Sequence, residues 1–364
     1  MSLAIDFTLP AVREAHEPPE ARGLGRDGVR LLVSRKDTRE ITHRVFRELP
    51  AILAPGDLLV VNNSATVAAA VRLDRLAVHF SGELPTGEWL VELRRRTSGA
   101  TEPYAGGAPG EWLPLPGQAT LRLVRRETPR LWRAVLNRDV PSYLDRYGVP
   151  IRYSYVERDW PLGHYQTVFG IEPGSAEMPS AGRPFTADLV TALVARGVGV
   201  APITLHTGVA SPEKDEPPYP ERFSVPAYTA RLVNLTRQNG GRVIAVGTTV
   251  VRALESAARA DALKTSPVQN GTAQNNTAQN NTGGAGTAQN DTVRAAEGWT
   301  AHVVTPDEGV RAVDGLLTGL HEPRSSHLMM LSAIADPELL SRSYQAALDE
   351  GYLWHEFGDT HLIL

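Results

Sequence analysis

The sequence predicts an α/β protein whose mixed-sheet core is interrupted by a small, barrel-like all-β domain. Helical and strand patterns alternate from about residue 145 onward, as they do in an α/β core. Residues 73–144 instead contain short alternating segments between Gly, Pro and charged turns, which is typical of a small barrel or sandwich. The apolar run 243–246 is short and β-branched, like a buried parallel strand. We therefore expect a discontinuous core, 1–72 and 145–364, around an inserted domain, 73–144.

The first part of the core begins with a predicted hairpin. Its strands are expected at 29–33 and 41–46, followed by a short helix at 46–53. A buried strand at 57–61 then leads into Asn62-Asn63-Ser64. In the inserted domain the expected strands are 76–80, 88–93, 119–124 and 131–136, with no helical periodicity.

The second part of the core begins with a helix capped by Thr186 and ended by Gly197. Its expected apolar face is Leu189, Val190, Leu193 and Val194. A strand at 198–205 ends at His206.

The remaining expected elements follow the apolar run 243–246. A helix should start near residue 248, a second at Ser325 or Ser326 with its apolar residues over 328–335, and a third over 337–350. The chain then closes with two strand-like pieces, 352–357 and 361–364.

One segment has a different composition. Residues 265–292 repeat Thr-Ala-Gln-Asn three times and have almost no large apolar side chains. Because such a segment cannot offset its ordering entropy, we expect a disordered surface loop within the core domain.

Composition excludes several classes of function. The 364 residues contain no cysteine, so disulfides, thiolate zinc sites, iron–sulfur clusters and cysteine nucleophiles are excluded. The net charge of −4 gives no global field that would attract nucleic acid. No run approaches the roughly 20 apolar residues of a membrane helix, and the first residues do not read as a signal peptide. A cytoplasmic protein is the expectation.

The turn after the 243–246 strand carries the most local information. Gly247 permits a sharp exit, and Thr248 or Thr249 is expected to cap the helix that follows. The start of such a helix exposes backbone N–H groups and the positive end of its dipole, which can hold a phosphate or a carboxylate. A purely structural cap is the alternative.

Several segments together resemble the S-adenosylmethionine:tRNA ribosyltransferase-isomerases of queuosine biosynthesis. Each segment is modest alone, but their number and order along nearly the whole chain are specific. They are Arg30–Val33 with Ile41–Pro50, Pro55–Ser64, Tyr165–Phe169, Pro179–Thr186, Thr204–Gly208, Gly241–Thr249, Val313–Thr318 and Phe357–Asp359.

The resemblance implies a transferase. Such enzymes move the ribosyl part of S-adenosylmethionine onto a 7-aminomethyl-7-deazaguanine base in tRNA, isomerise the sugar, and release adenine and methionine. S-adenosylmethionine would be a co-substrate, with no prosthetic group and no metal, and tRNA the partner. We expect a monomer.

The resemblance also suggests roles for single residues. His206, at a strand end, could move a proton at the ribose, or be a structural histidine. Thr248 and Thr249, with Gly247, could hold the methionine carboxylate. Asp314 could accept hydrogen bonds from ribose hydroxyls or the adenine amino group, or shape a turn.

A second group of residues is expected at the substrate-binding surface. Asn62 and Asn63 offer paired donors and acceptors, although a turn explains them equally well. Tyr165 and Gln166 could stack on and hydrogen-bond to a base, unless Tyr165 is core. Gly182 belongs to a further segment at the expected substrate surface. The clusters Arg94–Arg96 and Arg125–Arg126 could contact phosphates, but such charges more often face solvent.

The chain also departs from the family pattern. Ala65 and Ala70 stand where the family usually has arginines, and a proline between them is missing. Arg183-Pro184 replaces a usual Leu-His, and the run after His206 is changed. Alanine cannot imitate an arginine that binds phosphate. The pattern suggests a divergent paralogue, and leaves two alternatives: a small-molecule acceptor, or a homologue that binds S-adenosylmethionine or RNA without turnover.

Overall fold

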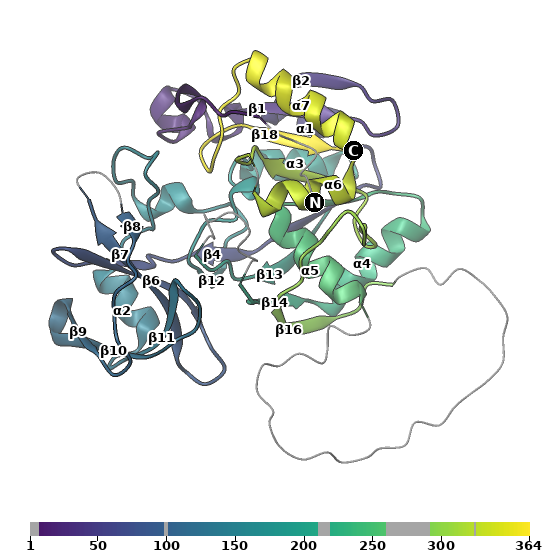
Figure 1. Ribbon diagram of the computed structural model, residues 1–364. Helices are drawn as coiled ribbons and strands as arrows, with labels where there is room; N and C mark the ends of the chain where they lie inside the picture. Colours follow the sequence, from purple (N-terminus) through teal and green to yellow (C-terminus); the bar gives the residue numbers. More distant parts are fainter. Residues whose placement is uncertain (1–6, 98–100, 210–218, 260–291, 324) are drawn as a thin grey trace, which may run out of the picture.

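The computed structural model describes residues 7–97, 101–209, 219–259, 292–323 and 325–364. The expected low-complexity loop 265–292 lies outside these ranges except for its last residue. Two sheets dominate the described chain, one large and mixed, the other curled and antiparallel (Figure 1). No helix among the described residues is long and apolar enough to cross a membrane.

The larger sheet has nine strands in the order β16-β14-β13-β3-β15-β17-β18-β1-β2. Its central strands β13, β3, β15 and β17 are parallel, while β18 runs antiparallel to β17. The strands are β1 Arg30–Ser34, β2 Ile41–Val45, β3 Leu58–Asn62, β13 Gly199–Leu205, β14 Glu221–Val225, β15 Val243–Val246, β16 Ala296–Thr300, β17 Gly315–Gly319 and β18 Thr360–Ile363.

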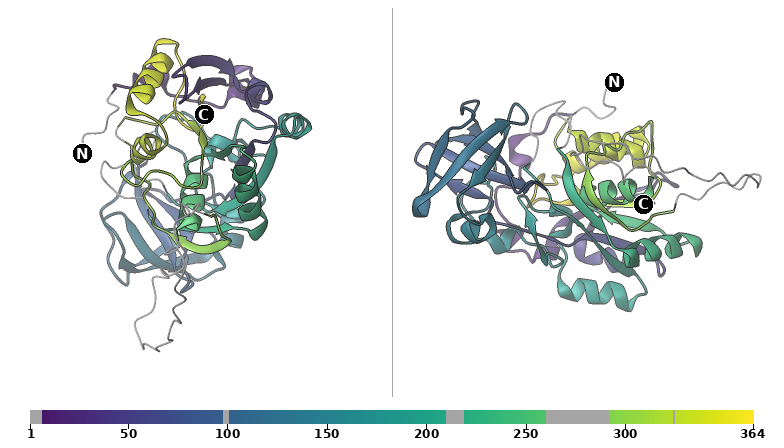
Figure 2. Two further views of the ribbon diagram at one scale, coloured as in Figure 1. Left: turned by 90° about the vertical axis from the view of Figure 1, so that its right-hand side faces the viewer. Right: turned by 90° about the horizontal axis from the view of Figure 1, so that it is seen from below.

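Helices cover both faces of this sheet (Figures 1 and 2). Alternation along β15 explains why, since Val243 and Ala245 join one apolar cluster and Ile244 and Val246 join another. The first cluster packs against α4 Ala227–Gln238, α5 Thr248–Ala258, α6 Ser326–Ile334 and α7 Pro337–Asp349, and the second against α1 Leu49–Ile52 and α3 Ala187–Ala195.

Short 3₁₀ helices connect several elements. They are η1 Ala11–Arg13, η2 Pro19–Arg22, η3 Arg26–Gly28, η4 Phe46–Glu48, η5 Pro116–Gln118, η6 Leu162–Tyr165 and η7 Ser180–Gly182. The last of these contacts β17.

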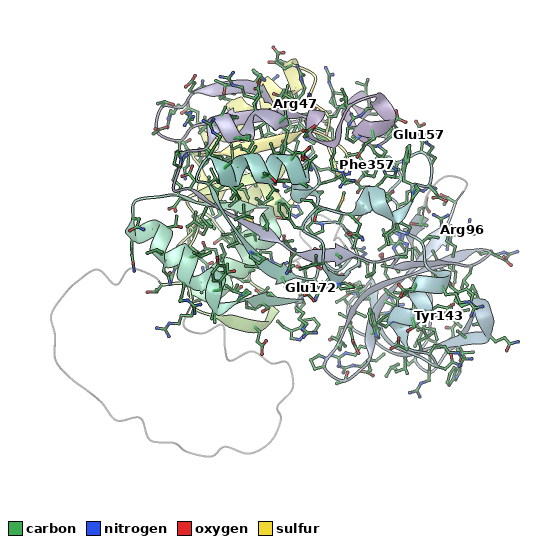
Figure 3. All side chains as sticks on the ribbon, turned by 180° about the vertical axis from the view of Figure 1, so that it is seen from behind. Arg47, Arg96, Tyr143, Glu157, Glu172 and Phe357 are labelled. Carbon is green, nitrogen blue, oxygen red and sulfur yellow. The ribbon has the colours of Figure 1, made fainter. Side chains whose placement is uncertain are left out.

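The second sheet lies to one side of the first and has its own apolar core (Figures 1 and 2). Its strand order is β5-β6-β7-β11-β10-β9, with β8 paired to β7, and all pairs are antiparallel. Figure 3 shows Arg96 and Tyr143 on this part of the molecule. The elements are β5 Ala70–Arg72, β6 Leu76–Glu83, β7 Trp89–Arg96, β8 Thr101–Pro103, β9 Trp112–Leu115, β10 Ala119–Arg126, β11 Leu131–Leu136 and the helix α2 Val140–Tyr147.

A small parallel pair, β4 Ser64–Thr66 and β12 Glu172–Ser175, leads from the large sheet toward the second one. An apolar cluster at this junction combines Ala69 and Ala70 with residues from both parts, including Leu131 and Ile151. The α/β core with a separate antiparallel sheet therefore agrees with the predicted fold class.

Several local predictions were wrong. The segment 352–357 forms no strand: Trp354 makes a single isolated bridge, and His355 adopts a left-handed backbone with φ 75°. A Cβ at Gly358 would lie 2.3 Å from the Leu353 carbonyl oxygen, so the chain turns too tightly for a strand. In α3, Thr186 caps as predicted by accepting from the Leu189 N–H at 3.1 Å, but Val194 is 56% exposed. Helices α2 and α4 were not anticipated.

Candidate active site

The carboxyl ends of four parallel strands meet at one edge of the large sheet. β3 ends at Asn62, β13 leads into His206, β15 into Gly247, and β17 ends at Gly319. The later strands are added on both sides of β3, with β13 on one side and β15 on the other. Open α/β sheets bind ligands at such switch points, beyond the carboxyl ends of the strands.

The turn after β15 starts the helix without a side-chain cap. Gly247 has φ 95°, which favours glycine, and it is itself the N-cap residue of α5. The predicted capping by Thr248 or Thr249 was therefore wrong. Among the described residues, nothing accepts a hydrogen bond from the backbone N–H of either threonine. Two donors at the positive end of an 11-residue helix are thus open to an anion.

Asn62 connects the segments of this edge. Its Nδ2 donates to the Leu205 carbonyl at 2.8 Å and to Thr249 Oγ1 at 3.3 Å. Its Oδ1 accepts from the N–H of Ser64 and of Leu205, both at 3.0 Å. Because the side chain is only 3% exposed and its donors and acceptors are all engaged, Asn62 holds the strand ends together and cannot read a base edge.

Asn63 is also tied to its surroundings, but less completely. Its Oδ1 accepts from Thr204 Oγ1 at 2.6 Å, and its backbone carbonyl accepts from the N–H of Ile171 and Glu172. The side-chain nitrogen has no described partner, and the residue is half-buried.

His206 lies directly after β13 and faces the β4–β12 pair. Its Nδ1 is 2.8 Å from Ser64 Oγ, and its ring packs against Gly174, where a Cβ would come within 2.5 Å of Nδ1. Burial, and then the nearby Arg222, lower the pKa of His206, while Glu172 opposes them. The imidazole is therefore neutral at pH 7, and no described residue bonds to Nε2.

Tyr165, Gln166 and Gly182 form part of the structural support. Tyr165 is buried against Phe357, with ring centroids 5.2 Å apart. Gln166 pairs with the backbone of Thr66, accepting from its N–H at 3.0 Å and donating to its carbonyl at 2.7 Å. Gly182 is buried in η7, where a Cβ would lie 3.3 Å from Thr167 Cγ2.

Asp314 lies at the opposite edge of the sheet. It precedes β17, and its Oδ2 accepts from the N–H of Val243, the first residue of β15, at 2.9 Å. Because β15 and β17 are parallel, both residues lie at the amino ends of their strands. The structure does not bring Asp314 together with His206 or Gly247, and the expected catalytic role has no geometric support.

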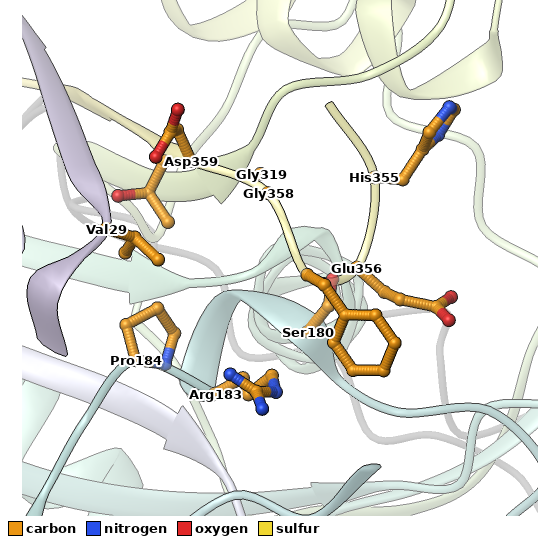
Figure 4. Close-up of a pocket in the computed structure, with 11 residues that line it drawn as sticks. Val29, Ser180, Arg183, Pro184, Gly319, His355, Glu356, Gly358 and Asp359 are labelled. Atoms are coloured by element: carbon orange, nitrogen blue, oxygen red, sulfur yellow. The ribbon is translucent and has the colours of Figure 1, made fainter. Parts of the chain in front are cut away.

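A hollow opens near the end of β17, between η7 and the closing loop of the chain (Figure 4). The hollow is small, with a cavity volume of about 10 Å³, which is room for about one water molecule. Its walls are Val29, Ser180, Arg183, Pro184, Gly319 and residues 355–360. Arg183 is buried over the Phe357 ring and pairs with Glu20 at 2.8 Å. Its charge is therefore balanced within the chain.

The closing loop carries a titratable group that the sequence did not reveal. Glu356 accepts a hydrogen bond from the Tyr155 hydroxyl at 3.0 Å, and its Oε1 is buried with no described partner. Burial, and then the neighbouring Glu177, raise the pKa of Glu356 to about 8. The segment Phe357–Asp359 was recognised as a family segment, but nothing in its spacing pointed to the preceding glutamate or to a tyrosine some 200 residues earlier.

The arginine clusters on the second sheet bond mainly to their own neighbours. Arg94 pairs with Glu92 at 2.8 Å, and Arg96 donates to the Leu73 carbonyl. Arg126 donates to three backbone carbonyls and lies over Trp132. β7 and β10, which carry the clusters, are separated by β11. These arginines do not form one patch at the candidate site.

Among the described residues, no group of His, Asp or Glu is arranged to hold a metal ion.

Comparisons with known proteins agree with the resemblance. The family described as queuosine biosynthesis protein matches residues 3–363. The chain belongs to this family. An S-adenosylmethionine:tRNA ribosyltransferase-isomerase of Acidiphilium cryptum is 35% identical, covering 100% of this chain and 99% of the relative. One from Heliobacterium modesticaldum is 33% identical, covering 99% and 98%. The crystal structure of an S-adenosylmethionine tRNA ribosyltransferase from Thermotoga maritima matches with a TM-score of 0.52 and 26% identity, covering 99% of this chain and 100% of that one.

The departures from the queuosine biosynthesis pattern now have positions. Ala70 is buried in the apolar cluster between the two sheets, 3% exposed, where a long cationic side chain would have no room without a shift. Ala65 is half-buried beside Gly170. Arg183 and Pro184 line the hollow near β17. These departures lie near the junction and the hollow, and a further one directly follows His206, while the Gly247 turn keeps the family pattern.

Proposed function

We propose that this chain is an S-adenosylmethionine:tRNA ribosyltransferase-isomerase of queuosine biosynthesis. It moves the ribosyl moiety of S-adenosylmethionine onto a 7-aminomethyl-7-deazaguanine base in tRNA and releases adenine and methionine. The observation that carries the proposal is the carboxyl edge, where two unbonded N–H groups lie at the start of α5. There Asn62 connects this helix start to Leu205, the residue before His206. The full-length relatives bear this activity in their names.

We propose that the donor's methionine carboxylate binds at the start of α5. The N–H groups of Thr248 and Thr249 can bond to a carboxylate, and the helix dipole favours its charge. Asn62 fixes this helix start relative to His206, because it bonds to both Thr249 and Leu205. S-adenosylmethionine enters as co-substrate, and no prosthetic group is assigned.

We propose further that the antiparallel sheet with α2 is an inserted domain, close to the predicted limits 73–144, within a core made of 1–72 and 145–364. β5 and the end of α2 lie just outside those limits, at 70–72 and 145–147. A monomeric state and a cytoplasmic location stay predictions.

One observation favours a second candidate function, with the same donor and a small-molecule acceptor. Ala70 replaces an arginine of the family pattern and is buried, and the two arginine clusters of the second sheet lie on separate strands. Fewer cationic groups are therefore gathered for tRNA phosphates than the resemblance implies.

The test is incubation of the purified protein with S-adenosylmethionine, with and without tRNA carrying the deazaguanine precursor, followed by mass spectrometry of the nucleosides. We expect adenine release and a modified nucleoside that depend on the tRNA. Adenine release without tRNA modification favours the small-molecule acceptor. No adenine release under any condition overturns both.

A further inference from the structure

A chain of hydroxyl groups connects the backbone to His206. The Thr207 N–H donates to Ser175 Oγ at 3.0 Å, Ser175 Oγ is 2.6 Å from Ser64 Oγ, and Ser64 Oγ is 2.8 Å from His206 Nδ1. Ser64 and Ser175 are 1% and 0% exposed, so bulk water does not reach their hydroxyl groups. Every hydrogen in this chain must therefore find its acceptor among these groups.

The direction of the bonds follows from one fixed donor. A backbone N–H can only donate, so Ser175 Oγ accepts from Thr207. The described contacts offer the Ser175 hydroxyl hydrogen one acceptor, Ser64 Oγ, and they then offer the Ser64 hydrogen only His206 Nδ1. The opposite arrangement, with a hydrogen on Nδ1, would leave one buried hydroxyl without an acceptor, which costs about 1–3 kcal/mol.

We infer that Ser175 and Ser64 are positioning residues that hold His206 as the tautomer with its hydrogen on Nε2. His206 then meets the substrate as a neutral hydrogen-bond donor and not as a general base, because the lone pair a base needs is engaged at Nδ1. This inference rests on the proposed function for its substrate and deepens the role of His206 within it.

The surroundings fit a neutral donor. Protonation at Nδ1 would force Ser64 to accept in place of donating, which would orphan a buried hydroxyl. The charged groups that face the ring are Arg222, from the adjacent strand β14, and Glu172, from β12. A fixed N–H can stabilise negative charge that develops on a substrate oxygen or nitrogen, and removing one such donor in an enzyme typically lowers kcat by about 10²–10³-fold.

Nuclear magnetic resonance of the intact protein with ¹⁵N-labelled histidine tests the tautomer directly. We expect His206 to show a protonated Nε2 and an unprotonated Nδ1 from pH 6 to 8, with its signals identified by their loss in His206→Gln. A protonated Nδ1 in this range overturns the inference. Because this readout needs no substrate, it is independent of whether the proposed activity is found.

Substitutions at Ser64 separate positioning from packing. In Ser64→Ala the tautomer should become mixed and the pKa of His206 should rise, since the bond that favours the neutral ring is lost. Ser64→Thr keeps the hydroxyl and should show the same tautomer and the same pKa of His206 as the parent protein. Ser34→Ala is the matched control, because Ser34 Oγ lies 2.7 Å from Ser343 Oγ and 2.8 Å from His361 Nε2 in a similar buried Ser–Ser–His chain in the core, away from this edge. An unchanged tautomer and an unchanged pKa of His206 in Ser64→Ala would refute the positioning role of the hydroxyl chain.

Substitutions at His206 separate donor from base. Glutamine offers an N–H near the position of Nε2 but cannot act as a base at neutral pH. Adenine release should fall about 10²-fold or more in His206→Ala and recover at least tenfold in His206→Gln. Equal loss in both variants would contradict a donor role.

Discussion

The two ends of the same parallel strands are built in opposite ways. At the amino end, Asp57 bonds to Arg242 at 2.6 and 3.0 Å, and Asp314 accepts from the Val243 N–H. These charged side chains at the amino end are therefore paired with a charge of opposite sign or with a backbone group. At the carboxyl end, the N–H groups of Thr248 and Thr249 have no described acceptor, and His206 Nε2 is open.

This difference shows where binding energy is available. A group that is already paired must break a bond before it can bind a ligand, whereas an unpaired donor held in place by its neighbours need not. The described groups at the amino end are paired and stabilise the sheet. The carboxyl end combines a stabilising residue, Asn62, with donors that are open to a ligand. Substitutions at the carboxyl end should therefore change turnover or ligand binding, whereas those at the amino end should not.

The largest expected effect comes from Asn62→Ala. It removes four hydrogen bonds and leaves the N–H of Ser64 and of Leu205 buried without partners. We expect the free energy of unfolding to fall by about 3 kcal/mol, as judged from the cost of buried unsatisfied groups. Any folded protein should show little turnover, because the position of His206 relative to α5 is lost.

The neighbouring residue supplies the control for this change. Asn63→Ala removes one described side-chain bond, to Thr204, so denaturant unfolding should show a loss of about 1 kcal/mol. Equal losses in the two variants would contradict the central role of Asn62.

The next effect tests the anion site without breaking the helix. Thr248 is the first residue of α5, a position where proline is favoured, and Gly247 has ψ 155°, which suits a following proline. Thr248→Pro should leave the unfolding free energy within about 1 kcal/mol. It should weaken S-adenosylmethionine binding about tenfold, because one bond to a charged group is lost.

Calorimetry of S-adenosylmethionine binding measures this change. Ala187→Pro is the matched control, since Ala187 is the first residue of α3 and its N–H likewise has no described acceptor. Unchanged affinity in Thr248→Pro, or an equal loss in Ala187→Pro, would show that the methionine carboxylate does not bind at the start of α5.

Local features of this site could be predicted from the sequence, but long-range ones could not. The Gly247 turn and the strand before it depend on neighbouring residues, so their pattern was sufficient. The clamp of Asn62 was missed because its partners are 143 and 187 residues away. Thr249 was expected to cap its own helix, but its hydroxyl accepts from Asn62.

Asp314 shows a further limit of sequence patterns. No strand parallel to β15 was predicted from the apolar residues that follow Asp314. Once that strand is known, a residue that precedes it must lie at the amino end, away from the turn that follows β15. The closing loop was misread for a related reason: its apolar residues resemble a strand, while its left-handed His355 and tight Gly358 turn depend on packing.

A smaller effect concerns Glu356, a buried carboxyl that forms no ion pair among the described residues. Asp57 forms an ion pair with Arg242, whereas Glu356 accepts a hydrogen bond from the Tyr155 hydroxyl. Burial, with Glu177 adding to the effect, raises the pKa of Glu356 to about 8. The folded protein keeps a proton that the unfolded chain releases above its ordinary pKa of 4.5, so stability falls as the pH rises from about 4.5 to 8. Glu356→Gln mimics the protonated group and should remove this loss.

The measurement is denaturant unfolding of both proteins at pH 5 and pH 8. The free energy of unfolding of Glu356→Gln minus that of the parent should be larger at pH 8 than at pH 5 by more than about 1 kcal/mol. One pKa unit corresponds to about 1.4 kcal/mol. A pH-independent difference would mean that Glu356 titrates normally.

The smallest effect is expected at the amino end, from Asp314→Asn. Asparagine keeps an oxygen that can accept from the Val243 N–H, so the unfolding free energy should change by less than about 1 kcal/mol. Adenine release should stay within about twofold of the parent, because the carboxylate lies at the opposite edge from His206. Kinetics of adenine release measures this, and Asp57→Asn, which weakens the pair with Arg242, controls for stability. A large fall in kcat with unchanged stability would return Asp314 to the active site and would erase the distinction between the two ends of the sheet.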